Sequence, residues 1–253
     1  MKSAVVVFSG GPDSTAAALW GVAEGFSLKL LTFQFKGDEQ NGELLAAMQV
    51  AKALALPHSI VDFKAPMSLF RPDVHVLMHA DTSQSSDKSK PHRMEFGAGL
   101  ILSTAAAYAV YHGYDCVIWG ANKDDLVGGR FEYSQKFADA IAGLVSKCTG
   151  KDFTIYVPFA KKHKHQVLKC FLGKEELFAQ TWSSKSCGSV QDGTTRSCIA
   201  RRLAAQLAGL SDHTQYVHEN FKNPLTKAQM QNFAKLSDDD FAKIFGSETK
   251  PFP

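Results

Sequence analysis

The sequence predicts an α/β protein with a doubly wound parallel sheet and a small helical C-terminal extension. Short apolar runs alternate with segments of helical length in which apolar residues recur about every 3.6 positions. The first apolar run leads directly into a pair of glycines and then into a helix start. Near residue 209 this alternation ends and short polar segments follow. Such alternation is typical of βαβ units, in which helices cover both faces of a parallel sheet.

The expected elements follow one another in a regular order. We expect strands at residues 4–8, 28–35, 58–63, 116–120 and 154–157, and helices at residues 13–24, 43–56, 96–112, 131–148 and 165–172. Farther along, Thr226 and Ser237 are typical helix N-cap residues. We therefore divide the chain into a main domain at residues 1–208 and a helical extension at residues 209–253.

Composition narrows the class of protein. The chain of 253 residues is 45% hydrophobic and 21% charged, which is ordinary for a globular protein. A net charge of +3 is too small to indicate a nucleic-acid partner. Five cysteines without disulfide spacing favour a reduced, cytoplasmic protein. The apolar stretch at residues 96–111 is shorter than the roughly 18–20 residues of a membrane span, so no membrane partner is expected.

The most informative segment reads F-S-G-G-P-D-S-T and opens the first helix. Its two glycines allow a tight turn, and its hydroxyl side chains lie beside the free N–H groups of the helix start. Such a helix start attracts anions through hydrogen bonds and the helix dipole. No lysine follows the glycines, so the loop is not a Walker A motif. We predict that it binds a phosphate chain through Phe8, Ser9, Gly10, Gly11, Pro12, Asp13, Ser14 and Thr15.

The S-G-G-P-D-S run resembles the PP-loop of the N-type ATP pyrophosphatases. Together with further patches, it makes the chain similar to the 7-cyano-7-deazaguanine synthase family, which makes the queuosine precursor. These patches are L-P-H-S-I-V-D at residues 56–62, P-H-R at 91–93, G-A-N at 120–122, P-F at 158–159, T-W-S at 181–183 and C-I-A-R at 198–201. Their order and spacing hold from about Ser3 to Ala205.

The resemblance implies a reaction and its cofactors. In that family ATP adenylates the carboxylate of 7-carboxy-7-deazaguanine and releases pyrophosphate, and Mg²⁺ accompanies the phosphates. Ammonia then displaces AMP to give an amide, and a second adenylation dehydrates the amide to a nitrile. An acyl-adenylate reacts with any amine held in line, so a small-molecule or protein amine could take the place of ammonia. We also expect a homodimer or a protein partner.

The resemblance also assigns roles to residues outside the glycine loop. Asp13, Lys164 and Arg93 are the implied catalytic residues, and Lys164 also holds the nucleotide. The implied substrate-binding residues are Arg93, Asn122, Asp125, Gly128 and Trp182. Lys164 lies in a basic run, K-K-H-K-H, whose other two lysines we interpret as solvated surface residues.

The chain departs from the family at two places. The four cysteines of the family's zinc site correspond here to Ser184, Asp192, Thr195 and Cys198, so we expect no structural zinc and assign no metal ligands. A substitute site built from Cys187, Asp192, His213 or His218 is the less favoured alternative. On the acceptor side, Met94 and residues 129–134 differ from the family pattern. They indicate an altered acceptor or end product, unless the extension merely replaces the zinc as a brace.

Two other functions remain open at this point. One is a transfer-RNA-modifying PP-loop enzyme of the thiolation or lysidine type, for which Cys187 and Cys198 are weak candidates and the acidic 238–240 run is unfavourable. The other is a non-catalytic nucleotide-binding subunit, which the retained Ser9, Asp13, Ser14 and Lys164 argue against.

Overall fold

The fold is a parallel five-stranded sheet between helices, as the sequence predicts. The computed structural model describes residues 1–34, 42–63, 96–127, 130–183, 190–219, 223–237, 240 and 243–244. Within these residues the strand order is β3-β2-β1-β4-β5, and every neighbouring pair is parallel. The strands are β1 (Ser3–Val7), β2 (Ser27–Gln34), β3 (His58–Asp62), β4 (Cys116–Trp119) and β5 (Thr154–Tyr156).

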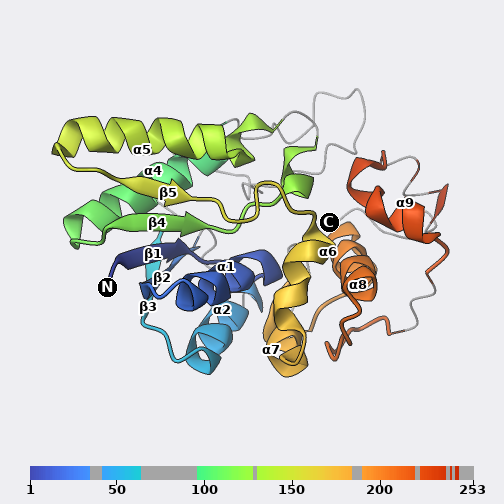
Figure 1. Ribbon diagram of the computed structural model, residues 1–253. Coiled ribbons are helices and arrows are strands. Elements are labelled where there is room, and N and C mark those ends of the chain that lie inside the picture. The colour runs from blue at the N-terminus through green and yellow to red at the C-terminus, as the bar shows by residue number, and fades with distance from the viewer. Residues whose placement is uncertain are drawn as a thin grey trace.

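Helices cover both faces of this sheet. In Figure 1, α4 (Gly97–Tyr111) and α5 (Gln135–Thr149) lie above it, and α1 (Pro12–Ala23) and α2 (Gly42–Ala53) lie below. Beyond the carboxyl ends of the strands come α6 (Lys164–Val167), α7 (Glu175–Gln180) and α8 (Arg196–Ala208), with α9 (Lys227–Gln231) farthest out. The 3₁₀ turns are η1 (Lys123–Leu126), η2 (Phe131–Tyr133), η3 (Leu168–Phe171) and η4 (Phe233–Lys235).

Several boundaries differ from the expected ones for local reasons. The helix expected at residues 131–148 starts only at Gln135, because the Ser134 hydroxyl caps it by accepting from Phe137 N at 3.1 Å. The helix expected at residues 165–172 is instead the short α6 followed by the tighter η3. Helices α7 and α8 have no counterpart among the expected elements. The predicted Thr226 cap is confirmed, since its hydroxyl accepts from Gln229 N at 3.4 Å.

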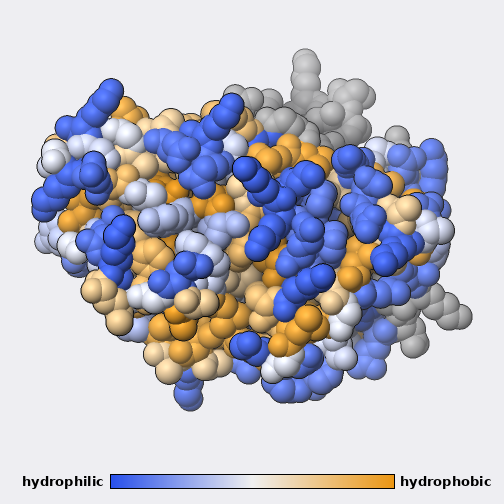
Figure 2. All heavy atoms as spheres, viewed as in Figure 1, coloured by the Kyte–Doolittle hydropathy of each residue, from blue (hydrophilic) through white to orange (hydrophobic). Residues whose placement is uncertain are grey.

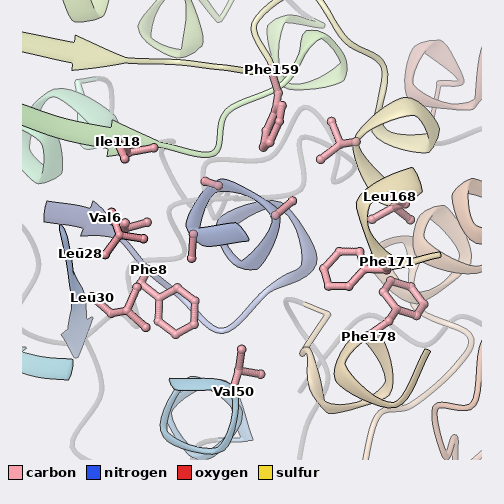
Figure 3. Packing of buried hydrophobic residues seen from close by; sticks show 14 of the residues in the cluster. Val6, Phe8, Leu28, Leu30, Val50, Ile118, Phe159, Leu168, Phe171 and Phe178 are labelled. Atoms are coloured by element: carbon pink, nitrogen blue, oxygen red, sulfur yellow. The ribbon is translucent and has the colours of Figure 1, made fainter. Parts of the chain in front are cut away.

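The sheet separates two hydrophobic clusters. Successive side chains of β1 point to opposite faces, so Val6 joins the cluster around α1 while Val5 joins the one under α4 and α5. Figure 3 shows α1 enclosed, with Val6 and Phe8 reaching it from the sheet and Phe171 and Phe178 from the opposite side. Full burial of each such side chain stabilises the fold by about 1.5–3 kcal/mol. The helix that starts at the glycine loop is thereby packed between the sheet and the segment of Phe171 and Phe178, and only its last residues, such as Val22, are exposed.

The topology gives β1 the place next to which ligands bind in open parallel sheets. This strand has β2 on one side and β4 on the other, so the chain leaves β1 and β4 in diverging directions at a topological switch point. Gly120, directly after β4, touches the start of α1 so closely that a Cβ there would lie 2.5 Å from the Asp13 carbonyl oxygen. The loops that follow β1 and β4 therefore meet at the carboxyl edge of the sheet.

The hydropathy of the surface differs between the carboxyl edge of the sheet and the region over α2. In Figure 2 hydrophilic residues gather on the right-hand side, over α6 to α8, whereas a hydrophobic area lies low on the left, over α2. On α2, Leu45 is 39% and Met48 49% exposed. No helix within the described ranges is long and apolar enough to cross a membrane.

The extension packs onto α8 through its own small cluster. Leu225 and Phe233 contact Ile199 and Leu203 on that helix. Leu210, by contrast, belongs to the cluster around α1. The division at residues 208 and 209 remains a prediction.

Candidate active site

The glycine loop between β1 and α1 has the geometry of an anion site. Gly10 has a φ of +73°, and a Cβ there would lie 2.4 Å from Ala47 N, so only glycine fits. Gly11 is the N-cap of α1 and supplies no side-chain cap. The hydroxyls fold back onto the loop: Ser9 Oγ accepts from Gly11 N at 3.3 Å, and Ser14 Oγ donates to Gly11 O at 3.1 Å. The helix start remains open to a negatively charged ligand.

Two buried hydroxyls at this loop have no hydrogen-bond partner within the described chain. They are Thr15 Oγ1, on the first turn of α1, and Ser183 Oγ. Ser183 follows Trp182, whose backbone N–H donates to the Gly10 carbonyl at 2.9 Å, so the segment 181–183 runs beside the loop. Buried polar groups are normally paired, and an exception calls for a ligand or water. The loop therefore fits the phosphates of a nucleotide.

The two other predicted residues of the loop, Phe8 and Pro12, serve the fold rather than the ligand through their side chains. The Phe8 ring is 1% exposed and belongs to the core, so only its backbone is available to a ligand. Its carbonyl accepts a hydrogen bond from the Thr32 hydroxyl at 2.7 Å. Pro12 opens α1, where the missing N–H costs nothing.

Two residues predicted from separate motifs meet at Asp13. Lys164 Nζ lies 2.6 Å from Asp13 Oδ2, and Asn122 Nδ2 donates to Asp13 Oδ1 at 3.2 Å. The side chains of Lys164 and Asp13 are 26% and 24% exposed, so both are accessible to a ligand at the glycine loop. The site therefore combines an anion-binding loop with a fixed cation.

Asp125 completes this group. Its Oδ2 accepts from Asn122 N at 2.8 Å. Burial, reinforced by the charge of Asp13, raises the pKa of the Asp125 carboxyl to about 6. Burial alone would lower the pKa of the Lys164 ammonium, but Asp13, Asp125 and Asp124 together raise it above its ordinary value. Lys164 therefore stays charged at neutral pH.

The structure describes only some of the other residues that we predicted to bind the substrate. Trp182 is 8% exposed, and it reaches the glycine loop through its backbone. Arg93, Gly128, Met94 and Gly129 lie outside the described residues. Lys161 and Lys162 are exposed, as we expected for solvated members of the basic run.

Sequence reasoning missed Asp124 and His163. Asp124 Oδ2 accepts from Lys164 N at 2.8 Å, and its Oδ1 lies 2.6 Å from His163 Nδ1. The signal was present in the sequence, as a second carboxylate beside Asp125 and a histidine before Lys164. Neither has meaning until the fold brings residues 124 and 163 together.

Asp192 and Thr195, which stand where the resemblance implies zinc ligands, accept hydrogen bonds at the start of a helix. Asp192 Oδ1 accepts from Thr194 N at 2.7 Å, from Thr195 N at 3.0 Å and from the Thr194 hydroxyl. Thr195 in turn caps α8 by accepting from Cys198 N at 3.2 Å. These contacts are ordinary helix-start chemistry.

Of the alternative metal ligands that the structure describes, Asp192 and His218 are neighbours, whereas His213 pairs with another residue. His213 pairs with Glu176 at 2.7 Å, and His218 Nε2 lies 4.0 Å from Asp192 Oδ2. Cys198 is fully buried, and Ser184 and Cys187 fall outside the described ranges. Within those ranges no three His, Cys, Asp or Glu side chains group as a metal site would. The absence of zinc itself remains a prediction.

A buried arginine links this region to the glycine loop. Arg201 is 1% exposed; it donates to Thr181 O at 3.0 Å, and to Thr181 Oγ1, Phe178 O and Thr214 Oγ1 at 2.6 Å each. Its guanidinium also lies 3.9 Å from the centre of the Phe178 ring. The buried Gln191 donates to Thr181 O at 2.8 Å and accepts from Ser183 N at 2.9 Å. We call these residues, 178–183, 191, 201 and 214, the arginine brace.

Comparisons with known proteins show the family of this chain. A family model described as Queuosine biosynthesis protein QueC matches residues 3–209. A 7-cyano-7-deazaguanine synthase 2 from Colwellia psychrerythraea is 28% identical over 222 residues, covering 85% of this chain and 99% of that protein. Another, from Sulfurisphaera tokodaii, is 26% identical over 226 residues; the match covers 85% of this chain and 48% of that longer protein.

Among solved structures, an NH₃-dependent NAD synthetase from Campylobacter jejuni is similar with a TM-score of 0.46 and 14% identity, over 100% of this chain and 90% of that chain. The family model spans most of the sequence, from β1 to the end of α8. The chain therefore belongs to the QueC family of queuosine biosynthesis proteins and is a synthase-type enzyme with a PP-loop fold.

Proposed function

We propose that this enzyme uses ATP to adenylate the carboxylate of a 7-deazaguanine-type compound, 7-carboxy-7-deazaguanine. A carboxylate oxygen attacks the α-phosphorus of ATP, the bond to the β-phosphate bridging oxygen breaks, and pyrophosphate leaves with that electron pair. The observation that carries this proposal is the fixed Lys164–Asp13 pair at the mouth of an uncapped helix start. Membership of the QueC family supports the choice of substrate.

The residues at the site answer the main physical obstacle to this step. A carboxylate and a triphosphate are both anions, so positive charge and oriented N–H groups must offset their repulsion. Lys164 supplies the charge, and the start of α1 supplies the N–H groups. The hydroxyls of Ser9, Ser14 and Thr15 would complete the phosphate contacts. Asp13 keeps the ammonium in place and would release it toward the more highly charged phosphates.

Mg²⁺ belongs to the same proposal. This ion prefers oxygen ligands and usually combines one or two carboxylates with substrate phosphates. Asp13 and Asp125 are carboxylates of the right type at the mouth of the loop, and they would hold it. The ion would neutralise part of the phosphate charge.

The second half of the reaction joins an amine to the activated carboxyl carbon. The amine attacks that carbon, the bond to the adenylate oxygen breaks, AMP leaves, and a proton passes to solvent. With ammonia the product is an amide, and adenylation of the amide oxygen followed by loss of AMP gives the nitrile. Because Met94 and residues 129–134 differ from the family pattern, we propose poor nitrile formation with ammonia alone and a need for a specific amine or protein partner. Arg93, Asn122, Gly128 and Trp182 are proposed to bind the deazaguanine.

The test is to identify the nucleotide products. The enzyme is incubated with MgATP and 7-carboxy-7-deazaguanine labelled with ¹⁸O in the carboxylate, with ammonia as the amine. We expect pyrophosphate, and AMP that carries one ¹⁸O atom. Lys164→Met should lower the rate by about 100-fold or more, whereas Lys161→Met, an exposed lysine of the same basic run, should match the native enzyme. ADP as the main product would refute the proposal.

The end product is tested separately. Nitrile formation with ammonia alone at about 0.1–1 per second would contradict the proposed need for a specific amine or protein partner. The enzyme would then be an ordinary synthase. In that case the extension serves only as a brace.

A further inference from the structure

Asp124 joins the two loops that carry the catalytic groups. It lies in η1, after β4, while His163 and Lys164 lie at the start of α6. One carboxylate oxygen of Asp124 accepts from the Lys164 backbone N–H at 2.8 Å, and the other is 2.6 Å from His163 Nδ1. An ionised carboxylate only accepts, so the proton between them belongs to the imidazole. Both side chains are mostly shielded from solvent, at 23% exposure for Asp124 and 31% for His163.

The same residue also orients the second partner of Asp13. The Asp124 backbone N–H donates to Asn122 Oδ1 at 2.9 Å. This contact fixes which end of the Asn122 amide is the acceptor, and so turns its Nδ2 toward Asp13 Oδ1. Asp124 thus holds both groups that contact the two oxygens of Asp13: the Asn122 amide and, through the backbone, the Lys164 ammonium.

Further contacts make the two loops one unit. Lys123 N donates to Lys162 O at 2.9 Å, and Asn122 forms a parallel bridge with Phe159. These are backbone contacts and will survive most side-chain changes. The Asp124 carboxylate is the side-chain connection between the loops that acts directly on residue 164.

We infer that Asp124 and His163 form a positioning clamp, which sets Lys164 and Asn122 against Asp13 before the triphosphate binds. The inference rests on the proposed function in one respect, namely that Lys164 meets the triphosphate. A displacement of about 1 Å in such a group can cost about 100-fold in rate. The clamp removes that displacement because the backbone of residue 164 is tied at its amide. It acts through Lys164, so neither member contacts the reacting atoms.

The clamp is tested with a graded pair of variants. Asp124→Ala removes both carboxylate contacts. Asp124→Asn keeps an oxygen for Lys164 N and offers its amide to His163 once the imidazole proton moves to Nε2. The matched control is Asp139→Ala on α5, an exposed carboxylate that accepts from Gln135 Nε2 at 2.7 Å. The readout is substrate-dependent exchange of labelled pyrophosphate into ATP, measured as kcat and KM.

We expect Asp124→Ala to lower kcat by about 10- to 100-fold with KM for ATP changed by less than about 3-fold. Asp124→Asn should recover most of the rate, and Asp139→Ala should match the native enzyme. An unchanged kcat in Asp124→Ala overturns the inference. So does a loss that follows the unfolded fraction seen by circular dichroism, because Asp124 would then be only structural.

A second readout needs no turnover and separates this inference from the proposed function. Hydrogen exchange is followed by NMR at the backbone amide of Lys164, which donates to Asp124 Oδ2 at 2.8 Å. In the native protein this amide should be protected from exchange with solvent. Asp124→Ala should remove the protection, and Asp124→Asn should keep most of it. If native enzyme shows no pyrophosphate exchange but this pattern of protection appears, the clamp stands and the proposed function fails; equal protection in all three proteins overturns the clamp.

Discussion

The glycine loop and the arginine brace meet at one hydrogen bond, yet they are built in opposite ways. The loop is made of residues adjacent in sequence, and it leaves Thr15 Oγ1 unpaired and Lys164 partly exposed. The brace is made of residues scattered between 178 and 214, and buried Arg201 donates four hydrogen bonds to protein groups, while its Nε lies 3.8 Å from Asp212 Oδ2 without a hydrogen bond. The contact between the two regions is Trp182 N to Gly10 O, at 2.9 Å.

This difference separates binding from support. A group meant for a ligand must keep hydrogen-bonding capacity that the protein itself does not use. A buried supporting group needs most of its hydrogen-bonding capacity met by the protein, and its charge balanced nearby, since an unpaired buried charge is costly. Ser183 lies at the border, with its N–H bound to Gln191 and its hydroxyl unpaired. The two regions should therefore respond differently to mutation, one in rate and the other in stability.

The largest effect is expected at Asp13, and it should fall on rate alone. Asp13→Ala removes the partner of both Lys164 and Asn122, so turnover should fall by about 100-fold or more. Because the side chain is partly exposed, the urea midpoint of unfolding should change little. Steady-state kinetics and urea titration on the same preparation check both expectations. A large loss of stability would mean that the loop, too, is mainly structural.

The next effect is expected at Arg201, and it should fall on stability. Arg201→Met keeps the bulk but leaves the Thr181 and Phe178 carbonyls without their guanidinium donor. The free energy of unfolding should fall by about 3 kcal/mol or more. Arg202→Met is the matched control: that guanidinium stacks 3.8 Å from the centre of the Tyr216 ring, and its loss should cost about 1 kcal/mol. Equal losses of unfolding free energy in the two variants would mean that Arg201 stabilises the fold no more than Arg202 does.

The loop could be predicted from sequence, whereas the brace could not. The order of strand, glycines, hydroxyls and helix start is a local signal, and two separate motifs named Asp13 and Lys164 as site residues, although their pairing was not predicted. Gln191, Thr214 and Phe178 have no such signal, because their meaning depends on contacts across long stretches of chain. Asp124 lies between these cases: it is adjacent to a predicted residue, but its partner is 40 positions away. The strands were found within a residue or two, since their buried runs are short and bounded by turns.

A smaller effect concerns pH and Asp125. Burial and Asp13 raise the pKa of this carboxyl to about 6, so the folded state favours its neutral form. The associated stability is complete below the ordinary carboxyl pKa and is lost as pH rises through about 6. Between those values the native protein should lose up to about 1.4 kcal/mol per pH unit relative to Asp125→Asn. Urea unfolding at a series of pH values measures this difference; parallel curves would contradict it.

The smallest effect, no change at all, is expected on metal removal. The side chains of Asp192 and Thr195 accept hydrogen bonds from backbone N–H groups at the start of α8, so we expect no structural zinc. A structural zinc site would contribute about 10–16 kcal/mol, and its removal could not be missed. Elemental analysis should find no stoichiometric zinc, and a chelator should leave Tm unchanged. One zinc per chain would overturn the expectation.

The bond between Trp182 and Gly10 has a consequence for the order of assembly. This hydrogen bond joins a residue near the start of the chain to one in its last third. The glycine loop therefore gains its contact with the 181–183 segment late in synthesis. During synthesis the N-terminal strand and helix emerge first, but the nucleotide site is incomplete until residue 182 and the brace behind it have left the ribosome. A nascent chain that ends before this point can form β1 and α1 without forming a closed site. The nucleotide proposed for this loop would therefore stabilise only a chain that has been synthesised beyond residue 182.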